Sequence, residues 1–414
     1  MSDVIIIGGG AAGLCCAGFA ARQGLSVTVV EGRERPARKL LVTGKGRCNL
    51  TNNCSPEEFM KNVPKNPKFL YSAAYSFTAA DTMELFESLG VPLKTERGNR
   101  VFPQSDSARD IVDALLRFCE EGNVRIITGR AAAILHNESG VTGVLLEGGE
   151  SLSAAAVVLA TGGMSYSATG SDGKGYALAK GVGHTITPLR ASLIPILCRE
   201  RCCADMMGLS LKNVTLSLWQ KGKKKPVFTD LGELLFTHFG VSGPLVLSAS
   251  AYMKGDINSY SLTIDLKPGL TAEQLDARIL RDFEGNLNKN LINILGLLLP
   301  RAMVPVAIDR AGIPMECKVN QITKEQRRSL VDTIKSFALT PTGLRPIEEA
   351  VITSGGVDVR EINPATMQSK LCRGLYFAGE VIDVDAYTGG FNLQIAFSTA
   401  YLAAQELAKP TEDK

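Results

Sequence analysis

The pattern of apolar and polar positions changes along the chain, and each change predicts a different kind of element. Residues 4–7 (VIII) are uniformly apolar and predict a buried strand, while residues 11–22 predict a helix that ends at Gly24. Residues 26–30 (SVTVV) predict a second strand. The chain therefore begins with one strand–helix–strand unit.

Two sheet-like textures follow this unit. Short apolar runs separated by glycine occupy residues 124–160 and predict a β-meander followed by a return strand. After about residue 191 the runs NVTLSLW (213–219) and YSLTIDL (260–266) alternate apolar and polar side chains. Such alternation is typical of a half-buried antiparallel sheet, so we expect a separate β-domain here.

The last third of the chain turns helical and then returns to the opening pattern. From residue 271 to about 337 the apolar period is helical, and capping-box spacing at Thr271–Gln274 and Thr323–Gln326 predicts two helix starts. Beyond the proline-rich segment 338–346, the strand-like LYFAGE resembles the first strand, and residues 391–407 predict a long apolar helix. We therefore predict an α/β nucleotide-binding domain in two pieces, with an insert of about residues 191–340.

The composition limits the partners. Lysine and arginine total 45 against 42 acidic residues, a net charge of +3 that does not by itself indicate nucleic acid or an anionic membrane. Ten cysteines without CxxC spacing predict reduced thiols, and the group Cys198, Cys202 and Cys203 is expected to be buried rather than to bind metal. The uncharged run 4–21 follows Asp3 instead of a basic segment, so we expect a cytoplasmic protein with no membrane span.

The opening turn carries the clearest chemistry. Gly8, Gly10 and Gly13 form GxGxxG between the first strand and the helix, and Glu31 ends the second strand. Gly8 permits the tight turn, Gly10 leaves room for a pyrophosphate, and Gly13 lets the helix approach the strand. Helix N-terminal amides favour the diphosphate, and Glu31 is placed to accept hydrogen bonds from a ribose. FAD and NAD both carry the ADP half that this unit would bind.

A basic, glycine-containing stretch comes directly after Glu31. Arg38, Lys39, Lys45 and Arg47 fall within residues 31–52. This pattern fits the lining of a long phosphate-bearing cofactor and equally a solvated basic loop.

Four segments are similar to the BaiN/YhiN type of flavoprotein: KLLVTGKGRCNLTN, VVLATGG, FTHFGVSGP and GLYFAGEVIDVDAYTGGFNLQIAFSTA. The similarity covers nearly the whole chain. This resemblance implies a Rossmann-like FAD-binding domain of the two-dinucleotide-binding-domain flavoprotein type at 1–190 plus 341–414. It also implies an inserted β-barrel-like domain at 191–270 plus about 323–340, and a helical subdomain at 271–322. The activity it implies is an NAD(P)H-linked oxidoreductase, with reduction of conjugated double bonds in 3-oxo bile acids assigned to the BaiN type.

The same resemblance implies the residues around FAD. Gly379 and Glu380 would meet the ribityl chain, and the helix that begins after Gly390 would point its amides at the flavin pyrimidine, where reduced flavin is anionic. The predicted cofactor-binding residues are Gly8, Gly10, Ala11, Ala12, Gly13, Glu31, Gly32, Lys39, Leu40, Arg47, Cys48, Asn49, Ala131, Thr161, Gly162, Gly379, Glu380, Gly389, Gly390, Phe391, Asn392 and Leu393.

Candidate catalytic groups each have two interpretations. The Tyr387 hydroxyl either polarises or protonates the substrate, or the ring simply packs on the flavin. Cys48 is either a thiolate with a lowered pKa or a packed thiol. His238 and Ser242 either line a substrate mouth or, for Ser242, cap a helix.

We expect a FAD oxidoreductase that takes hydride from NADH or NADPH and reduces the activated C=C bond of an apolar enone. A tRNA-modifying flavoprotein is the first rival, because KGKKKP (221–226) is a dense cationic run, although a solvated hairpin end also explains that run. A flavin oxidase or redox sensor is the second rival. The expected partner is a small apolar carbonyl compound rather than nucleic acid.

Overall fold

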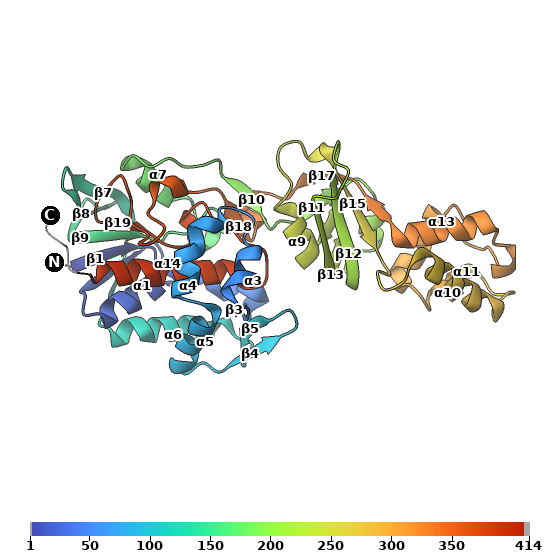
Figure 1. The fold of residues 1–414 in the computed structure, drawn as a ribbon, viewed down its shortest axis with the longest axis horizontal. Helices are drawn as coiled ribbons and strands as arrows, with labels where there is room; N and C mark the ends of the chain where they lie inside the picture. Colours follow the sequence, from blue (N-terminus) through green and yellow to red (C-terminus); the bar gives the residue numbers. More distant parts are fainter. Residues whose placement is uncertain (1, 410–414) are drawn as a thin grey trace. The chain divides into compact units, whose positions relative to one another are not determined.

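The computed structural model describes residues 2–409, which form two compact units (Figure 1). Unit 1 contains residues 2–192 and 347–409, and unit 2 contains residues 193–346. The chain thus leaves the first unit once and returns to it. Each unit has its own hydrophobic core.

The centre of unit 1 is a parallel sheet in the order β6-β2-β1-β9. Its strands are β1 (Ser2–Ile7), β2 (Val27–Glu31), β6 (Arg125–Thr128) and β9 (Ser151–Leu159). Val4, Ile5, Ile6 and Ile7 are buried, as expected for a strand covered on both faces. The predicted strand–helix–strand unit is confirmed by the parallel pairing of β1 with β2.

Strand β9 is where the two pieces of unit 1 meet. Residues 151–153 pair antiparallel with β8 (Gly140–Leu146), and residues 157–159 pair parallel with β19 (Leu375–Phe377) from the C-terminal piece. Strand β7 (Ala131–Asn137) continues the antiparallel part, so the predicted meander is confirmed for β7, β8 and β9. The run VRIITG does not join that meander, because it forms β6 beside β2 at the parallel edge.

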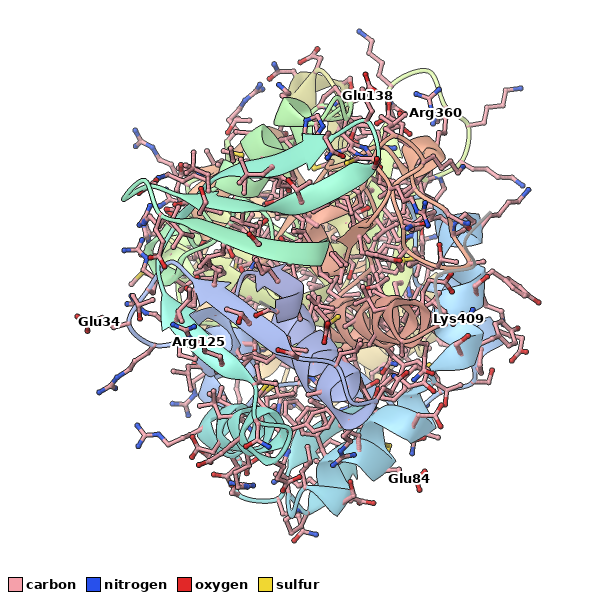
Figure 2. All side chains as sticks on the ribbon, turned by 90° about the vertical axis from the view of Figure 1, so that its left-hand side faces the viewer. Glu34, Glu84, Arg125, Glu138, Arg360 and Lys409 are labelled. Atoms are coloured by element: carbon pink, nitrogen blue, oxygen red, sulfur yellow. The ribbon has the colours of Figure 1, made fainter. Side chains whose placement is uncertain are left out.

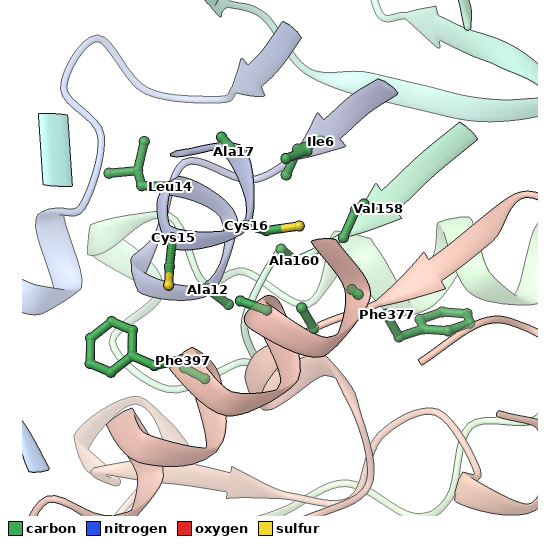
Figure 3. Close-up of a cluster of buried hydrophobic side chains, with 14 of the residues drawn as sticks. Ile6, Ala12, Leu14, Cys15, Cys16, Ala17, Val158, Ala160, Phe377 and Phe397 are labelled. Atoms are coloured by element: carbon green, nitrogen blue, oxygen red, sulfur yellow. The ribbon is translucent and has the colours of Figure 1, made fainter. Parts of the chain in front are cut away.

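Helices α1 (Ala11–Arg22) and α14 (Phe391–Leu407) pack together over this sheet (Figure 3). Leu14, Cys15 and Cys16 from α1 and Phe397 from α14 are all fully buried in the shared core. These helices come from opposite ends of the chain, so the core of unit 1 depends on both pieces.

The remaining elements of unit 1 surround this core. They are α2 (Arg38–Val42), β3 (Thr51–Asn52), α3 (Pro56–Lys61), α4 (Tyr71–Ser76), α5 (Ala79–Ser88), β4 (Leu93–Glu96), β5 (Arg100–Pro103), α6 (Ala108–Glu121), α7 (Lys174–Gly181), β10 (Arg190–Ser192) and β18 (Ile352–Ser354). Strands β3, β5 and β4 form a small antiparallel sheet, and β10 pairs only with β18 among the described strands.

Unit 2 is a seven-stranded antiparallel sheet with attached helices. The strand order is β16-β15-β12-β13-β14-β11-β17. The elements are β11 (Ile196–Cys198), α8 (Cys202–Asp205), β12 (Ser210–Gln220), β13 (Phe228–Thr237), β14 (Gly240–Ser242), α9 (Pro244–Ser250), β15 (Tyr260–Asp265), α10 (Ala272–Glu284), α11 (Leu291–Leu295), α12 (Val304–Arg310), α13 (Lys324–Lys335), β16 (Phe337–Leu339) and β17 (Pro341–Leu344).

Both predicted capping boxes in unit 2 are confirmed, because Thr271 with Gln274 begins α10 and Thr323 with Gln326 begins α13. Residues 324–335, assigned to the β-domain, form the helix that the capping box at Thr323 predicted. One segment lies elsewhere than expected, because residues 341–344, assigned to the nucleotide-binding domain, form β17 in the sheet of unit 2.

Charged side chains such as Glu34, Glu84, Arg125 and Glu138 project away from the ribbon of unit 1 (Figure 2). Within residues 2–409, no helix combines the length and apolar character needed to cross a membrane.

Candidate functional site

The glycine turn between β1 and α1 contains two glycines that the fold requires and one that it does not. A Cβ atom on Gly13 would lie 1.8 Å from the Gly8 carbonyl oxygen, and one on Gly8 would lie 2.6 Å from the Ala160 carbonyl oxygen. A Cβ atom on Gly10 would meet nothing within 4 Å. Gly10 therefore leaves a bare backbone face that protein packing does not explain.

Gly10 is also the N-cap of α1, and the first turn of this helix, which includes Ala11 and Ala12, contains neither a side-chain cap nor an acidic residue. The helix dipole and the uncapped amides favour an anion at this end. The geometry fits the pyrophosphate that the GxGxxG pattern predicts.

Glu31 holds the turn in place. Its carboxylate accepts hydrogen bonds from the Gly9 amide at 2.7 Å and from the Arg33 amide at 2.9 Å. The neighbouring Gly32 lies beside Arg130, whose Cγ would be 3.4 Å from an added Cβ atom. Ribose binding by Glu31 stays a prediction, and each carboxylate oxygen retains a second lone pair for it.

Lys39 and Glu380 connect the two pieces of unit 1. The Lys39 ammonium lies 2.7 Å from Glu380 Oε2 and donates to the Ser165 hydroxyl at 2.8 Å. The other oxygen of Glu380 accepts from the Thr353 amide at 2.8 Å. Lys39 is therefore an ion-pair partner that positions Glu380, in addition to bordering the predicted cofactor site.

Arg47 is bound to carboxylates. Its guanidinium donates to Glu96 and Asp106, with an Nε–Oδ1 distance of 2.8 Å to Asp106, and stacks 4.2 Å from the Phe102 ring centroid. The guanidinium lowers the pKa of the Glu96 carboxyl, and Lys94 together with Arg47 lowers the pKa of the Asp106 carboxyl. Much of its positive charge is thus neutralised within the protein.

Cys48 does not have the lowered pKa that its basic surroundings suggested. The side chain is fully buried, and this burial raises the thiol pKa to about 12, while a weaker hydrogen bond with Thr43 acts in the opposite direction. The structure favours the packed-thiol interpretation, because the side chain lies in the core, where desolvation disfavours the charged thiolate. Cys48 is a packed neutral thiol.

Three polar atoms in or beside the predicted cofactor set are buried and lack a hydrogen-bond partner among residues 2–409: Asn49 Oδ1, Thr161 Oγ1 and Arg33 Nε. Buried polar atoms are rarely left unpaired in folded proteins. Together with the open face of Gly10, they fit a large polar cofactor such as FAD.

Gly379 brings the C-terminal piece against the start of α1. Its φ is +76°, and a Cβ atom there would lie 2.9 Å from the Ala12 Cβ. Gly162 also has a positive φ, +70°, and an added Cβ atom would approach the Ser171 hydroxyl at 3.0 Å. Any side chain at Gly379 would therefore push the C-terminal piece away from the start of α1.

The start of α14 has the same character as that of α1. Gly389 and Gly390 have φ values of +126° and +100°, and a Cβ atom on Gly390 would lie 2.3 Å from the Thr51 carbonyl carbon. Gly390 is the N-cap, and the first turn lacks a side-chain cap and acidic residues. The Asn392 side chain donates to the Ala386 oxygen at 2.8 Å and accepts from its amide at 2.9 Å, so it fixes the preceding loop.

Other predicted residues are placed as follows. Leu40 and Phe391 are buried in the core, Leu393 is half-buried in the first turn of α14, and Ala131 begins β7. Tyr387 is half-buried, and its amide donates to the Asn62 carbonyl at 3.0 Å.

The candidate residues in unit 2 lie on or between strands β12, β13 and β14. Lys221, Lys223, Lys224 and Lys225 are exposed at the end of the β12–β13 hairpin, as the hairpin interpretation predicted. His238 lies between β13 and β14. Ser242 does not cap α9, because the N-cap is Gly243 and no side-chain cap is formed.

Sequence reasoning missed Gln394. This buried amide accepts from the hydroxyls of Thr51 at 2.6 Å and Thr82 at 2.9 Å, and it donates to the Phe77 carbonyl at 3.0 Å. It ties α14 to β3 and α5 behind the Gly390 turn. The signal was Gln394 and Ser398, which are four residues apart in a mainly apolar helix pattern.

Known proteins match the chain over its whole length. The HI0933-like protein Rossmann domain family matches residues 2–406. The ribosomal RNA dihydrouridine synthase of Escherichia coli (strain K12) is 33% identical over 408 residues, or 98% of both chains. The 3-dehydro-bile acid delta(4,6)-reductase of Clostridium scindens is 30% identical over 419 residues, or 99% of this chain and 100% of that relative.

A solved structure agrees at the level of the fold. The 3-ketosteroid-delta4-(5alpha)-dehydrogenase from Rhodococcus jostii RHA1, in complex with 4-androstene-3,17-dione, has a TM-score of 0.54 at 15% identity, covering 99% of this chain and 97% of that one. The predicted α/β fold with a Rossmann-type domain is confirmed.

Proposed function

The chain belongs to the HI0933-like Rossmann family, and from this premise we propose that it is a FAD-dependent oxidoreductase that reduces a carbon–carbon double bond conjugated to a carbonyl group. The names of two relatives support this reaction. Dihydrouridine differs from uridine by two hydrogens across a double bond conjugated to a ring carbonyl, and a 3-oxo-Δ4 bile acid carries the same arrangement. The chemistry common to both is therefore the proposal, and the substrate is a separate question.

The chain's own residues support FAD as the cofactor. The bare backbone at Gly10 and the uncapped start of α1 would hold the diphosphate, and the unpartnered atoms of Asn49 and Thr161 would gain hydrogen bonds from the cofactor. The uncapped start of α14, behind Gly390, would stabilise negative charge on the flavin pyrimidine. When bound, FAD supplies two-electron hydride chemistry between a nicotinamide donor and the substrate.

The surrounding residues keep this site in shape. The Lys39–Glu380 pair joins the segments on both sides of the predicted ribityl position, and the Asn392 side chain fixes the loop that carries Tyr387. Tyr387 would contact the flavin or the substrate from that loop. NADH or NADPH is proposed as the donor that visits the flavin transiently.

An anaerobic experiment tests this function. FAD-loaded protein is expected to lose its yellow colour with NADH or NADPH and to regain it when an enone or a uridine-containing RNA is added. Product with two added hydrogens, detected by mass spectrometry, would establish the reaction. If neither nicotinamide bleaches the protein, the proposed electron donor is wrong; if bleached protein reoxidises only with oxygen, the oxidase rival replaces the reductase.

Two observations favour uridine in RNA as a second substrate candidate beside an apolar enone. The ribosomal RNA dihydrouridine synthase is 33% identical. Unit 2 contains 20 lysine and arginine residues against 14 acidic residues, whereas the rest of the chain contains 25 against 28. The near-neutral total therefore hides a basic unit, which suits a polyanion. Recolouring of bleached protein by RNA but not by enones would favour this candidate over the enone.

A further inference from the structure

The loop between Glu380 and α14 contains two aspartates in different environments. Asp383 forms an ion pair with Lys65, and its backbone carbonyl accepts from the Asn66 side chain at 2.6 Å. Asp385 is 4% exposed, and its Oδ1 atom has no hydrogen-bond partner among residues 2–409. The two carboxyls are therefore not equivalent, and only Asp383 forms an ion pair.

Two hydroxyls accompany Asp385. In the β10–β18 ladder, Arg190 is opposite Ser354 and Ser192 is opposite Ile352, so Ser192 and Ser354 point to the same face. Both serines lie close enough to Asp385 to lower the pKa of its carboxyl. Ser192 is 1% exposed, Ser354 is fully buried, and neither hydroxyl forms a hydrogen bond of normal geometry within the described chain.

The net effect on Asp385 favours its protonated form. Burial raises the pKa of the carboxyl above its usual value, and the opposing effects of Lys65, Arg190 and the two serines are smaller. A neutral carboxylic acid is a hydrogen-bond donor, as are two serine hydroxyls. Three O–H groups thus gather at one buried place, and neither serine hydroxyl nor Asp385 Oδ1 has a partner of normal hydrogen-bond geometry among residues 2–409.

The cluster is next to the proposed flavin site along the chain. The Asp385 loop continues through Tyr387 to Gly390 at the start of α14. Between Ile352 and Ser354 on β18, Thr353 donates its amide to Glu380, the partner of Lys39. Elements that hold the cluster are therefore the ones that shape the proposed cofactor site.

We propose that Asp385, Ser192 and Ser354 form a subsite that binds the carbonyl oxygen conjugated to the reducible double bond. This inference rests on the proposed reductase function. A carbonyl oxygen has two lone pairs and can accept hydrogen bonds from two of these O–H groups. Donors placed at the oxygen where negative charge develops also lower the barrier for hydride addition at the conjugated carbon.

Binding to the oxidised, FAD-loaded protein without nicotinamide tests this subsite independently of turnover. Cyclohex-2-enone and uridine are the probes, and cyclohexene and 4-deoxyuridine are their matched analogues without the carbonyl. Isothermal titration calorimetry is used for Asp385→Ala, Asp385→Asn, Ser192→Ala and Ser354→Ala. The control is Asp358→Asn, because the Asp358 carboxyl is also buried but already has Arg360 as its ion-pair partner.

Asp385→Ala and each serine variant should bind at least one carbonyl probe with an affinity about tenfold lower than the wild type, which is the loss expected for one such hydrogen bond. The matched analogue should bind equally to all variants, and Asp385→Asn, which keeps a neutral donor, should lose less than Asp385→Ala. The subsite is overturned if neither carbonyl probe binds the wild type, or if no probe distinguishes these variants from Asp358→Asn. Protein that binds the enone through Asp385 but never reduces it overturns the reductase function alone.

Discussion

The Lys39 ammonium and the Glu380 carboxylate lie 2.7 Å apart although they belong to opposite ends of the chain. Lys39→Met would leave a mostly buried carboxylate without its cation, so we expect a loss of about 1–3 kcal/mol in the free energy of unfolding and about tenfold weaker FAD binding. Chemical denaturation and FAD titration measure the two effects. Lys174→Met is the matched control, since its pair with Glu147 is about half exposed and should contribute less than about 1 kcal/mol.

The two glycines at either end of the α1 turn should respond differently to alanine. Gly10 has φ −85° and ψ −168°, which alanine adopts freely, and the added methyl meets no protein atom. We expect Gly10→Ala to fold with an unchanged melting temperature without FAD and to bind FAD at least about tenfold more weakly. Gly13→Ala should fail to fold, because its methyl would overlap the Gly8 carbonyl. Wild-type FAD affinity in Gly10→Ala would contradict the pyrophosphate assignment.

Cys48 should be inert in the native protein. With a pKa raised to about 12 by burial, almost none of this thiol is ionised at pH 8, and it is also inaccessible. Brief alkylation at pH 8 followed by peptide mass spectrometry should label the partly exposed Cys317 well before Cys48. Cys48→Ala should retain turnover, and faster labelling of Cys48 than of Cys317 would restore the reactive-thiolate interpretation.

His184 should make unit 1 less stable as the pH falls. Burial lowers the pKa of this imidazole below 6.5, although the hydrogen-bonded Glu361 opposes the shift. Below pH 6.5 the unfolded chain therefore binds more protons at this position than the folded chain, and protonation favours unfolding. Urea titrations should give a lower free energy of unfolding at pH 5.5 than at pH 7.5, and His184→Gln should reduce that difference. If wild type and His184→Gln lose the same free energy of unfolding between pH 7.5 and pH 5.5, a group other than His184 causes the pH dependence.

The exposed lysines of the β12–β13 hairpin separate the two substrate candidates. If RNA is the substrate, replacing Lys221, Lys223, Lys224 and Lys225 by alanine should weaken RNA binding by about tenfold or more and reduce its dependence on salt concentration. Enone binding should not change. Filter binding between 50 and 200 mM salt, on the order of the range where counterion release dominates, measures this. Lys409→Ala in unit 1 is the control, and equal RNA binding by all three proteins would remove the hairpin from the interface.

Periodicity predicted the parts of the fold that depend on local patterns. The uniformly apolar VIII run became a strand buried in a parallel sheet, and the Thr271 and Thr323 capping boxes began helices where expected. The double pairing of β9 was not predictable in this way, since its partners β8 and β19 are set by the packing of the complete unit.

The predicted cofactor site also combines local features, which the sequence predicts, with contacts between distant segments, which it does not. Gly8, Gly10 and Gly13 have roles that follow from the motif, because a turn and a helix start act over a few residues. The partners of Arg47 come from distant segments that contribute Glu96 and Asp106, so no local pattern could predict that its charge is used there. The direction of the Cys48 side chain depends on a φ of +58° within the loop, which turns the thiol into the core.

The meeting of β8 and β19 on the single strand β9 has a consequence for biosynthesis. During translation β1, α1 and β9 leave the ribosome first, whereas β19 and α14 follow only after the whole of unit 2 has been made. The apolar face of α1 that α14 later covers must therefore stay exposed in the nascent chain, where it invites aggregation or chaperone binding. Unit 2 is free to fold in that interval, because its core uses only its own residues, so the inserted unit should mature before unit 1 is complete.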